Sequence, residues 1–159
     1  MIILGIDPGS VITGYGVITK QGRHCKLIEC GAIRTKSGQA LPDRLKQIYD
    51  GLCQVIDTHK PEQVAIESMF AGRYPKAALT LGHARGVALL AVANRDLPVS
   101  EYAPREVKMA VVGVGAASKE QVQYMVRAIL KLSRVPKPAD AADAVAIALC
   151  HTQRTLGRI

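Results

Sequence analysis

The first eighteen residues, MIILGIDPGSVITGYGVI, place a carboxylate at the end of an apolar run. Residues 2–6 are apolar or glycine, the run stops at Asp7, and the following Pro-Gly pair favours a turn. A second apolar stretch over residues 14–20 predicts a neighbouring strand. An Asp before Pro-Gly is commonly a turn residue whose side chain bonds the local backbone. Whether Asp7 is such a residue or a ligand depends on whether other acids lie beside it.

The rest of the chain alternates between strand and helix patterns. Strands are expected at 2–7, 14–20, 24–34, 64–67 and 98–102, and helices at 41–59, 76–94, 104–112, 118–132 and 139–157. A helical crossover between the first and fourth strands makes those two strands parallel, whereas a hairpin joins the second and third. The sequence therefore predicts an α/β fold, a single domain over residues 1–159, with a mixed five-stranded sheet flanked by helices.

Glu67 is the second acid that stands at a strand end. It follows Val64-Ala65-Ile66, a wholly apolar run that is typical of a central strand. A carboxylate there costs several kcal/mol, on the order of a buried unpaired charge, unless a cation compensates it. Because the carboxyl ends of neighbouring parallel strands meet at one edge, Asp7 and Glu67 are expected to share a site.

The segment PADAADAVAIAL supplies two more acids. Asp140 and Asp143 are three residues apart near a helix start, and therefore lie on one face. Asp140 could simply cap the helix and Asp143 could occupy its first turn. The rest of the helix is nearly all apolar through Leu149, however, so its face should lie on the sheet. Two carboxylates near that face need a partner there.

Together these four acids predict a metal centre. Each close pair of carboxylates repels by about 4 kcal/mol at an effective dielectric constant near 20, and divalent cations relieve that repulsion. Oxygen ligands, without His or Cys at a suitable spacing, favour Mg²⁺ or Mn²⁺ over zinc. Two such ions about 4 Å apart are typical of phosphodiester hydrolysis. The pattern indicates a nuclease.

The charge balance agrees with a polyanionic partner. The net charge is +8 and the pI about 9.5, which favours nucleic acid through counterion release. Residues 103–137 hold seven basic side chains and two acidic ones. These charges could form an ordinary solvated helix face, or they could join Arg73 and Lys76 in flanking the carboxylates and holding phosphates.

Several other features point to a reduced cytosolic protein. The four cysteines form no C-x-x-C pair, and no run of 18 apolar residues or secretion signal is present. We expect a cytoplasmic protein without a membrane span. The four histidines have no metal-ligand spacing and are expected to be surface or packing residues.

Five segments in order resemble the RuvC family of Holliday junction resolvases: GIDPGSVITGYGVI, AIESMF, LGHARG, VKMAVVGVGAASKEQV and ADAADAVAIAL. The resemblance implies a ribonuclease H-like fold and a homodimer. It also implies paired nicking of four-way DNA junctions that depends on two Mg²⁺ ions, which Mn²⁺ can replace, and leaves 5′-phosphate and 3′-hydroxyl ends. The RuvA and RuvB branch-migration proteins would be partners. GIDPG alone also opens ATP-binding domains of the actin and Hsp70 type, and a non-catalytic junction-binding module is a further alternative.

The resemblance assigns roles to individual residues. The metal-binding acids would be Asp7, Glu67, Asp140 and Asp143. Phe70 would be the aromatic beside the junction centre, although a lone Phe is usually a core residue. Lys108 and Lys119 would lie near the scissile phosphate, although either could be an ordinary solvated helix residue.

Two further features of the resemblance concern the region after Glu67. Tyr74 and Ala77 stand where many relatives have Asn and Ser, so the DNA contacts of that loop are in doubt. The small residues Ala78, Gly82 and Gly86 form the candidate dimer face of the next helix, with packing onto the sheet as the alternative.

Overall fold

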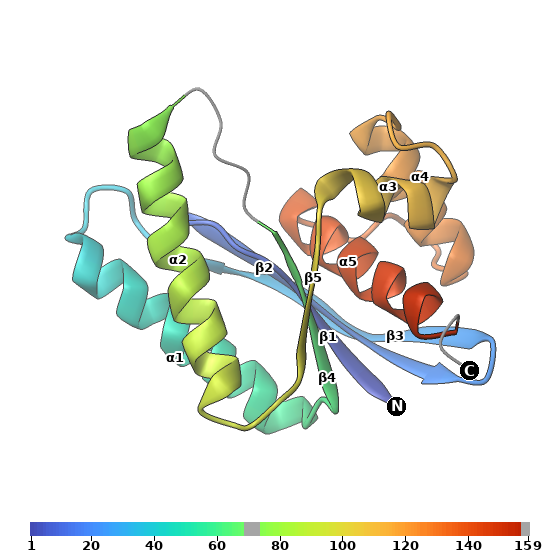
Figure 1. Ribbon diagram of the computed structural model, residues 1–159, viewed down its shortest axis with the longest axis horizontal. Coiled ribbons are helices and arrows are strands. Elements are labelled where there is room, and N and C mark those ends of the chain that lie inside the picture. The colour runs from blue at the N-terminus through green and yellow to red at the C-terminus, as the bar shows by residue number, and fades with distance from the viewer. Residues whose placement is uncertain (69–73, 157–159) are drawn as a thin grey trace.

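The structure is a computed structural model that describes residues 1–68 and 74–156 (Figure 1). Phe70 and Arg73 lie outside the described residues. The strands are β1 (Ile2–Asp7), β2 (Ile12–Gln21), β3 (His24–Arg34), β4 (Gln63–Glu67) and β5 (Val99–Tyr102). They form one five-stranded sheet in the order β3-β2-β1-β4-β5. The mixed sheet expected from the sequence is confirmed.

The central strand β1 joins the two halves of the sheet. It runs antiparallel to β2, with Asp7 opposite Gly14, and parallel to β4, with Ile6 beside Ile66. Since β1 and β4 run in the same direction and in this register, the next residue of each strand lies at the same edge. That edge carries Asp7 and Glu67.

Helices cover both faces of the sheet. One face carries α1 (Leu41–His59) and α2 (Pro75–Ala93), and the other carries α3 (Pro104–Val112), α4 (Lys119–Ile129) and α5 (Ala139–Leu156) (Figure 1). The core is accordingly split into two clusters, one on each face of the sheet. In the described part of the chain, none of these helices is long and apolar enough to cross a membrane.

The element bounds follow the sequence closely, with one clear difference in α4. The structure confirms the predicted bounds of β1, β3, α1 and α3. The helix expected over 118–132 begins after the Ser118 cap but ends at Ile129. It ends there because Lys131 adopts the left-handed conformation, at φ 52°, and the Leu132 N–H donates to the Arg127 carbonyl oxygen at 2.9 Å.

Three glycines of the sheet lie in direct contact with α5. A Cβ atom at Gly5 would overlap the Ala144 carbonyl oxygen, and one at Gly14 would overlap the Asp140 carbonyl oxygen. At Gly16 it would press on Val145. The helix backbone thus lies directly on β1 and β2, closer than any side chain on these strands would allow.

We expect Gly5→Ala to lower the free energy of unfolding by at least about 1–3 kcal/mol, because the added methyl group overpacks the helix seat. Gly38→Ala is the matched control, since a Cβ at Gly38 would meet open space, and it should change stability by less than about 0.5 kcal/mol. Urea denaturation of both variants measures the difference. Equal midpoints would show that α5 does not rest on the Gly5 backbone.

Candidate active site

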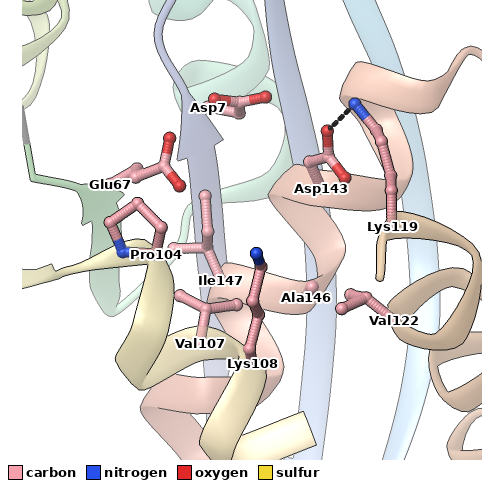
Figure 2. A pocket seen from close by; sticks show the side chains of 10 residues that line it. All are labelled: Asp7, Glu67, Pro104, Val107, Lys108, Lys119, Val122, Asp143, Ala146 and Ile147. Carbon is pink, nitrogen blue, oxygen red and sulfur yellow. Dashed lines mark ion pairs between the residues drawn. The ribbon is translucent and has the colours of Figure 1, made fainter. Parts of the chain in front are cut away.

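A pocket opens where β1 and β4 end, between the sheet edge and helices α3, α4 and α5 (Figure 2). Its lining combines acidic, basic and apolar side chains: Asp7, Glu67, Pro104, Val107, Lys108, Lys119, Val122, Asp143, Ala146 and Ile147. Three of the four predicted acids and both predicted lysines therefore meet in one pocket. They come from five different elements of the fold.

The positions of the acids follow from the packing already described. Asp7 and Glu67 are the last residues of β1 and β4, so the strand register places them at one edge. Asp143 lies one turn into α5, on the face that rests on the sheet glycines. Asp140 does not line the pocket, but its backbone lies against Gly14, the cross-strand partner of Asp7. The close seat of α5 is therefore what brings the two halves of the acidic cluster together.

The two lysines of the pocket come from the helices α3 and α4. Lys119 is the first residue of α4, whose start is fixed by a capping box in which Ser118 and Gln121 bond reciprocally at 3.1 and 2.8 Å. Its Nζ lies 2.8 Å from Asp143 Oδ2, as the dashed line in Figure 2 marks. Lys119 is thus paired inside the pocket, not simply solvated. Lys108 projects from α3.

The acids perturb one another strongly. Burial, followed by the charges of Glu67, Asp143 and Asp140, raises the pKa of Asp7 from 3.8 to about 8, with Lys119 opposing the rise. Burial and the Asp143 charge also raise the pKa of Glu67, whereas a hydrogen bond with Asp7 lowers it. Without a cation, Asp7 therefore keeps its proton at neutral pH. This is the electrostatic state expected of a carboxylate cluster built to receive positive charge.

The donor chemistry fits a hard divalent cation. The acids provide carboxylate oxygens, the ligands that Mg²⁺ and Mn²⁺ prefer, and two of the acids are partly buried at one edge. In the arrangement of the described residues, no three His, Cys, Asp or Glu side chains converge tightly enough to form a closed ligand cage. Binding of an ion by these acids would require their side chains to rotate toward it.

Of the remaining predicted residues, those that the structure describes do not line this pocket. Lys76 is exposed at the start of α2, as are Tyr74 and Ala77, the two positions that depart from the family pattern. Phe70 and Arg73 fall on residues that the structure does not describe.

Sequence reasoning missed the apolar floor of the pocket and one arginine. Val107 and Val122 are buried on α3 and α4, and their helical spacing could have identified them. Arg85 of α2 donates from Nε to the Glu67 carbonyl oxygen at 3.2 Å. Its only sequence signal is a charged residue within a largely apolar helix.

Comparisons with known proteins agree over nearly the whole chain. The family described as "Crossover junction endodeoxyribonuclease RuvC" matches residues 3–151. A protein of that name from Tolumonas auensis is 58% identical over 160 residues, which cover 99% of this chain and 91% of the relative. The RuvC structure from Thermus thermophilus in complex with Holliday junction substrate is 36% identical, with a TM-score of 0.92 over 99% of this chain and 96% of that one.

The fold and the pocket define an endonuclease of the ribonuclease H-like class. Carboxylates at the ends of β1 and β4 and on α5 face two lysines in one pocket. The chain belongs to the RuvC family of crossover junction endodeoxyribonucleases. This membership decides against an ATP-binding domain of the actin and Hsp70 type.

We expect Asp7→Asn to stabilise the metal-free protein at pH 8. With a pKa of about 8 in the folded state and 3.8 ordinarily, Asp7 binds more protons in the folded state, so stability falls as pH rises between those values. Asn removes this loss and should raise the melting temperature by about 3–8 °C, on the order of 1–2 kcal/mol. The gain should shrink toward pH 4.

Thermal melts in a chelator at both pH values measure this effect. Asp50→Asn is the control, since Asp50 is exposed and pairs only with Lys46 across one helical turn. A pH-independent difference between Asp7→Asn and wild type would contradict the raised pKa.

Proposed function

We propose that this chain resolves four-way DNA junctions by hydrolysing one phosphodiester bond in each of two strands, at symmetric positions. The observation that carries the proposal is the convergence of Asp7, Glu67 and Asp143 beside Lys108 and Lys119 in one pocket. The Thermus thermophilus relative was solved in complex with Holliday junction substrate. A net charge of +8 supports a DNA substrate. Such an activity serves DNA recombination and repair.

The proposed cofactor is a pair of Mg²⁺ ions, which Mn²⁺ can replace. Asp7, Glu67, Asp140 and Asp143 would hold them, because the charges of the two α5 acids act on Asp7, and that of Asp143 also on Glu67, at the sheet edge. When bound, divalent ions activate water and stabilise the charge that develops on phosphate oxygens.

The residues around the acids contribute positioning and electrostatics. Lys108 and Lys119 bind the non-bridging oxygens of the scissile phosphate and stabilise their charge. The water oxygen bonds to phosphorus as the P–O3′ bond breaks, and a proton goes to the departing oxygen, which leaves 5′-phosphate and 3′-hydroxyl ends. Val107, Val122 and Ile147 form the apolar floor, which lowers the local dielectric and strengthens these contacts.

We assign further DNA binding to Phe70, Arg73 and Lys76, in the part of the sequence that follows Glu67. Phe70 would stack on an unpaired base at the crossover, a contact worth about 1–3 kcal/mol. Arg73 and Lys76 would contact phosphates, which positions the junction without reading its sequence. The exposure of Lys76 is compatible with this role.

Two symmetric cuts require two active sites, so we propose a homodimer with twofold symmetry. The exposed face of α2 supports it: Leu79 and Leu90 are 68% and 53% exposed, and His83, Gly86 and Ala93 continue the same stripe at a spacing of three and four residues. The inner face of α2 carries Ala84, Ala88 and Ala91 instead. Of the face expected from the sequence, Gly86 is exposed, while Ala78 and Gly82 are partly covered.

The cellular setting is also a proposal. A cytoplasmic location is consistent with four cysteines that form no disulfide. Cooperation with RuvA and RuvB rests on the family resemblance.

Asp7→Asn and Glu67→Gln should each abolish nicking of a synthetic four-way junction in Mg²⁺, while junction affinity stays within a few fold of wild type. The acids hold the ions, whereas the basic surface holds the DNA. A gel assay of cleavage and a binding titration in Ca²⁺ measure the two properties. Asp50→Asn is the control and should change neither cleavage nor junction affinity. Parallel loss of binding and cleavage in folded protein would refute the separation of roles.

Leu90→Glu should convert the dimer into a monomer and strongly reduce paired nicking, since a charge would be buried at the twofold interface. Tyr124→Glu is the matched control, because Tyr124 is 62% exposed on α4, on the opposite face of the sheet. Sedimentation equilibrium measures the assembly. A wild-type monomer with full activity would overturn the dimer.

A further inference from the structure

Arg85 connects α2 to the ends of two neighbouring strands. Its Nε donates to the backbone carbonyl of Glu67 at 3.2 Å, and its Nη2 lies 2.5 Å from Glu101 Oε2. Glu67 ends β4, and Glu101 is the penultimate residue of β5. The arginine side chain is only 16% exposed, whereas that of Glu101 is 51% exposed. A largely buried guanidinium thus spans the end of the strand that presents an acid of the pocket.

The Glu67–Ser68 peptide is held through both of its polar groups. Glu67 is the last residue of β4, paired with Tyr102, and the Ser68 N–H donates to the Tyr102 carbonyl oxygen at 2.9 Å. Arg85 adds a second anchor, on the carbonyl side of the same Glu67–Ser68 peptide. A rigid donor on the carbonyl of Glu67 limits rotation of that peptide and therefore the direction in which its side chain leaves the backbone.

We infer that Arg85 is a positioning residue for Glu67: it fixes the backbone from which the Glu67 carboxylate reaches a divalent ion. The inference rests on the proposed function, in which Glu67 holds such an ion. The planar guanidinium donates a hydrogen bond to the carbonyl and forms an ion pair with the Glu101 carboxylate, an arrangement that a lysine ammonium on its flexible stem cannot reproduce. The Glu101 carboxylate forms an ion pair with Nη2 of the same guanidinium, so its role is to orient Arg85.

The competing explanation is purely structural: Arg85 would merely fasten α2 to the sheet. The chain offers a matched control for this. Arg95, just beyond the end of α2, makes a two-pronged ion pair with Asp57 of α1, at 2.8 and 2.7 Å. It is comparably covered, at 23% exposed, and touches no pocket residue. Removing either arginine loosens α2, but only Arg85 contacts Glu67.

The test measures Mn²⁺ binding to the DNA-free protein by electron paramagnetic resonance, for wild type, Arg85→Gln, Arg85→Lys, Glu101→Gln and Arg95→Gln. We expect Arg85→Gln to weaken Mn²⁺ binding about tenfold, as is typical when the group that orients a metal ligand is lost. Arg85→Lys and Glu101→Gln should have smaller losses. Arg95→Gln should bind Mn²⁺ as wild type does, even if its melting temperature falls as far as that of Arg85→Gln.

Junction nicking supplies the second readout. The Mg²⁺ concentration that gives half-maximal nicking should rise about tenfold in Arg85→Gln, while the rate at saturating Mg²⁺ largely recovers. Arg85→Gln with lowered stability and unchanged Mn²⁺ affinity would overturn the inference. Should Arg85→Gln fail to fold, Arg85→Lys and Glu101→Gln make the same comparison. Equal Mn²⁺ binding by wild type and Asp7→Asn would instead refute the proposed metal centre, and with it this role of Arg85.

Discussion

The contact between the backbone of α5 and the glycines of β1 and β2 is the constraint on which the rest of the site depends. Gly5, Gly14 and Gly16 leave no side chain between the helix and the sheet, so the helix carrying Asp140 and Asp143 comes directly against the strand that ends in Asp7. Residues more than 130 positions apart in the chain thereby become neighbours. A helix resting on ordinary side chains would lie farther from the sheet, and its carboxylates would not perturb Asp7.

The close approach of the acids costs free energy, which packing in other parts of the fold offsets. Burial and the charges of three neighbouring acids raise the pKa of Asp7. Protonation of Asp7 relieves this repulsion when no cation is bound. The apolar packing on both faces of the sheet offsets this local cost. Sites that concentrate like charge are commonly the least stable part of an enzyme, and here the acids stand at strand ends, where they disturb the sheet least.

Much of the fold and most of the site could be predicted from the sequence, because both depend on short-range patterns. The apolar runs before Asp7 and Glu67 define strand ends, and parallel strands place these ends together. The end of α4 could not be predicted, since no glycine marks it and Lys131 adopts a conformation that its residue type does not favour. Arg85 was missed for another reason: its contact with Glu67 depends on how α2 packs, which no local pattern encodes.

The ion pair between Lys119 and Asp143 joins the lysine proposed to bind a phosphate to an acid proposed to hold a cation. With Asp7 protonated, the positive charges of Lys108 and Lys119 offset the negative charges of the other acids. The net charge of the pocket without a cation is therefore small. In the proposed mechanism, a divalent ion bound by Asp143 would release the Lys119 ammonium from its ion pair and leave it available for a phosphate. By thermodynamic reciprocity, a phosphate that draws Lys119 away makes Asp143 a better ligand for the ion. If Asp143 holds the ion and Lys119 the phosphate, as proposed above, cation and DNA would bind with positive cooperativity.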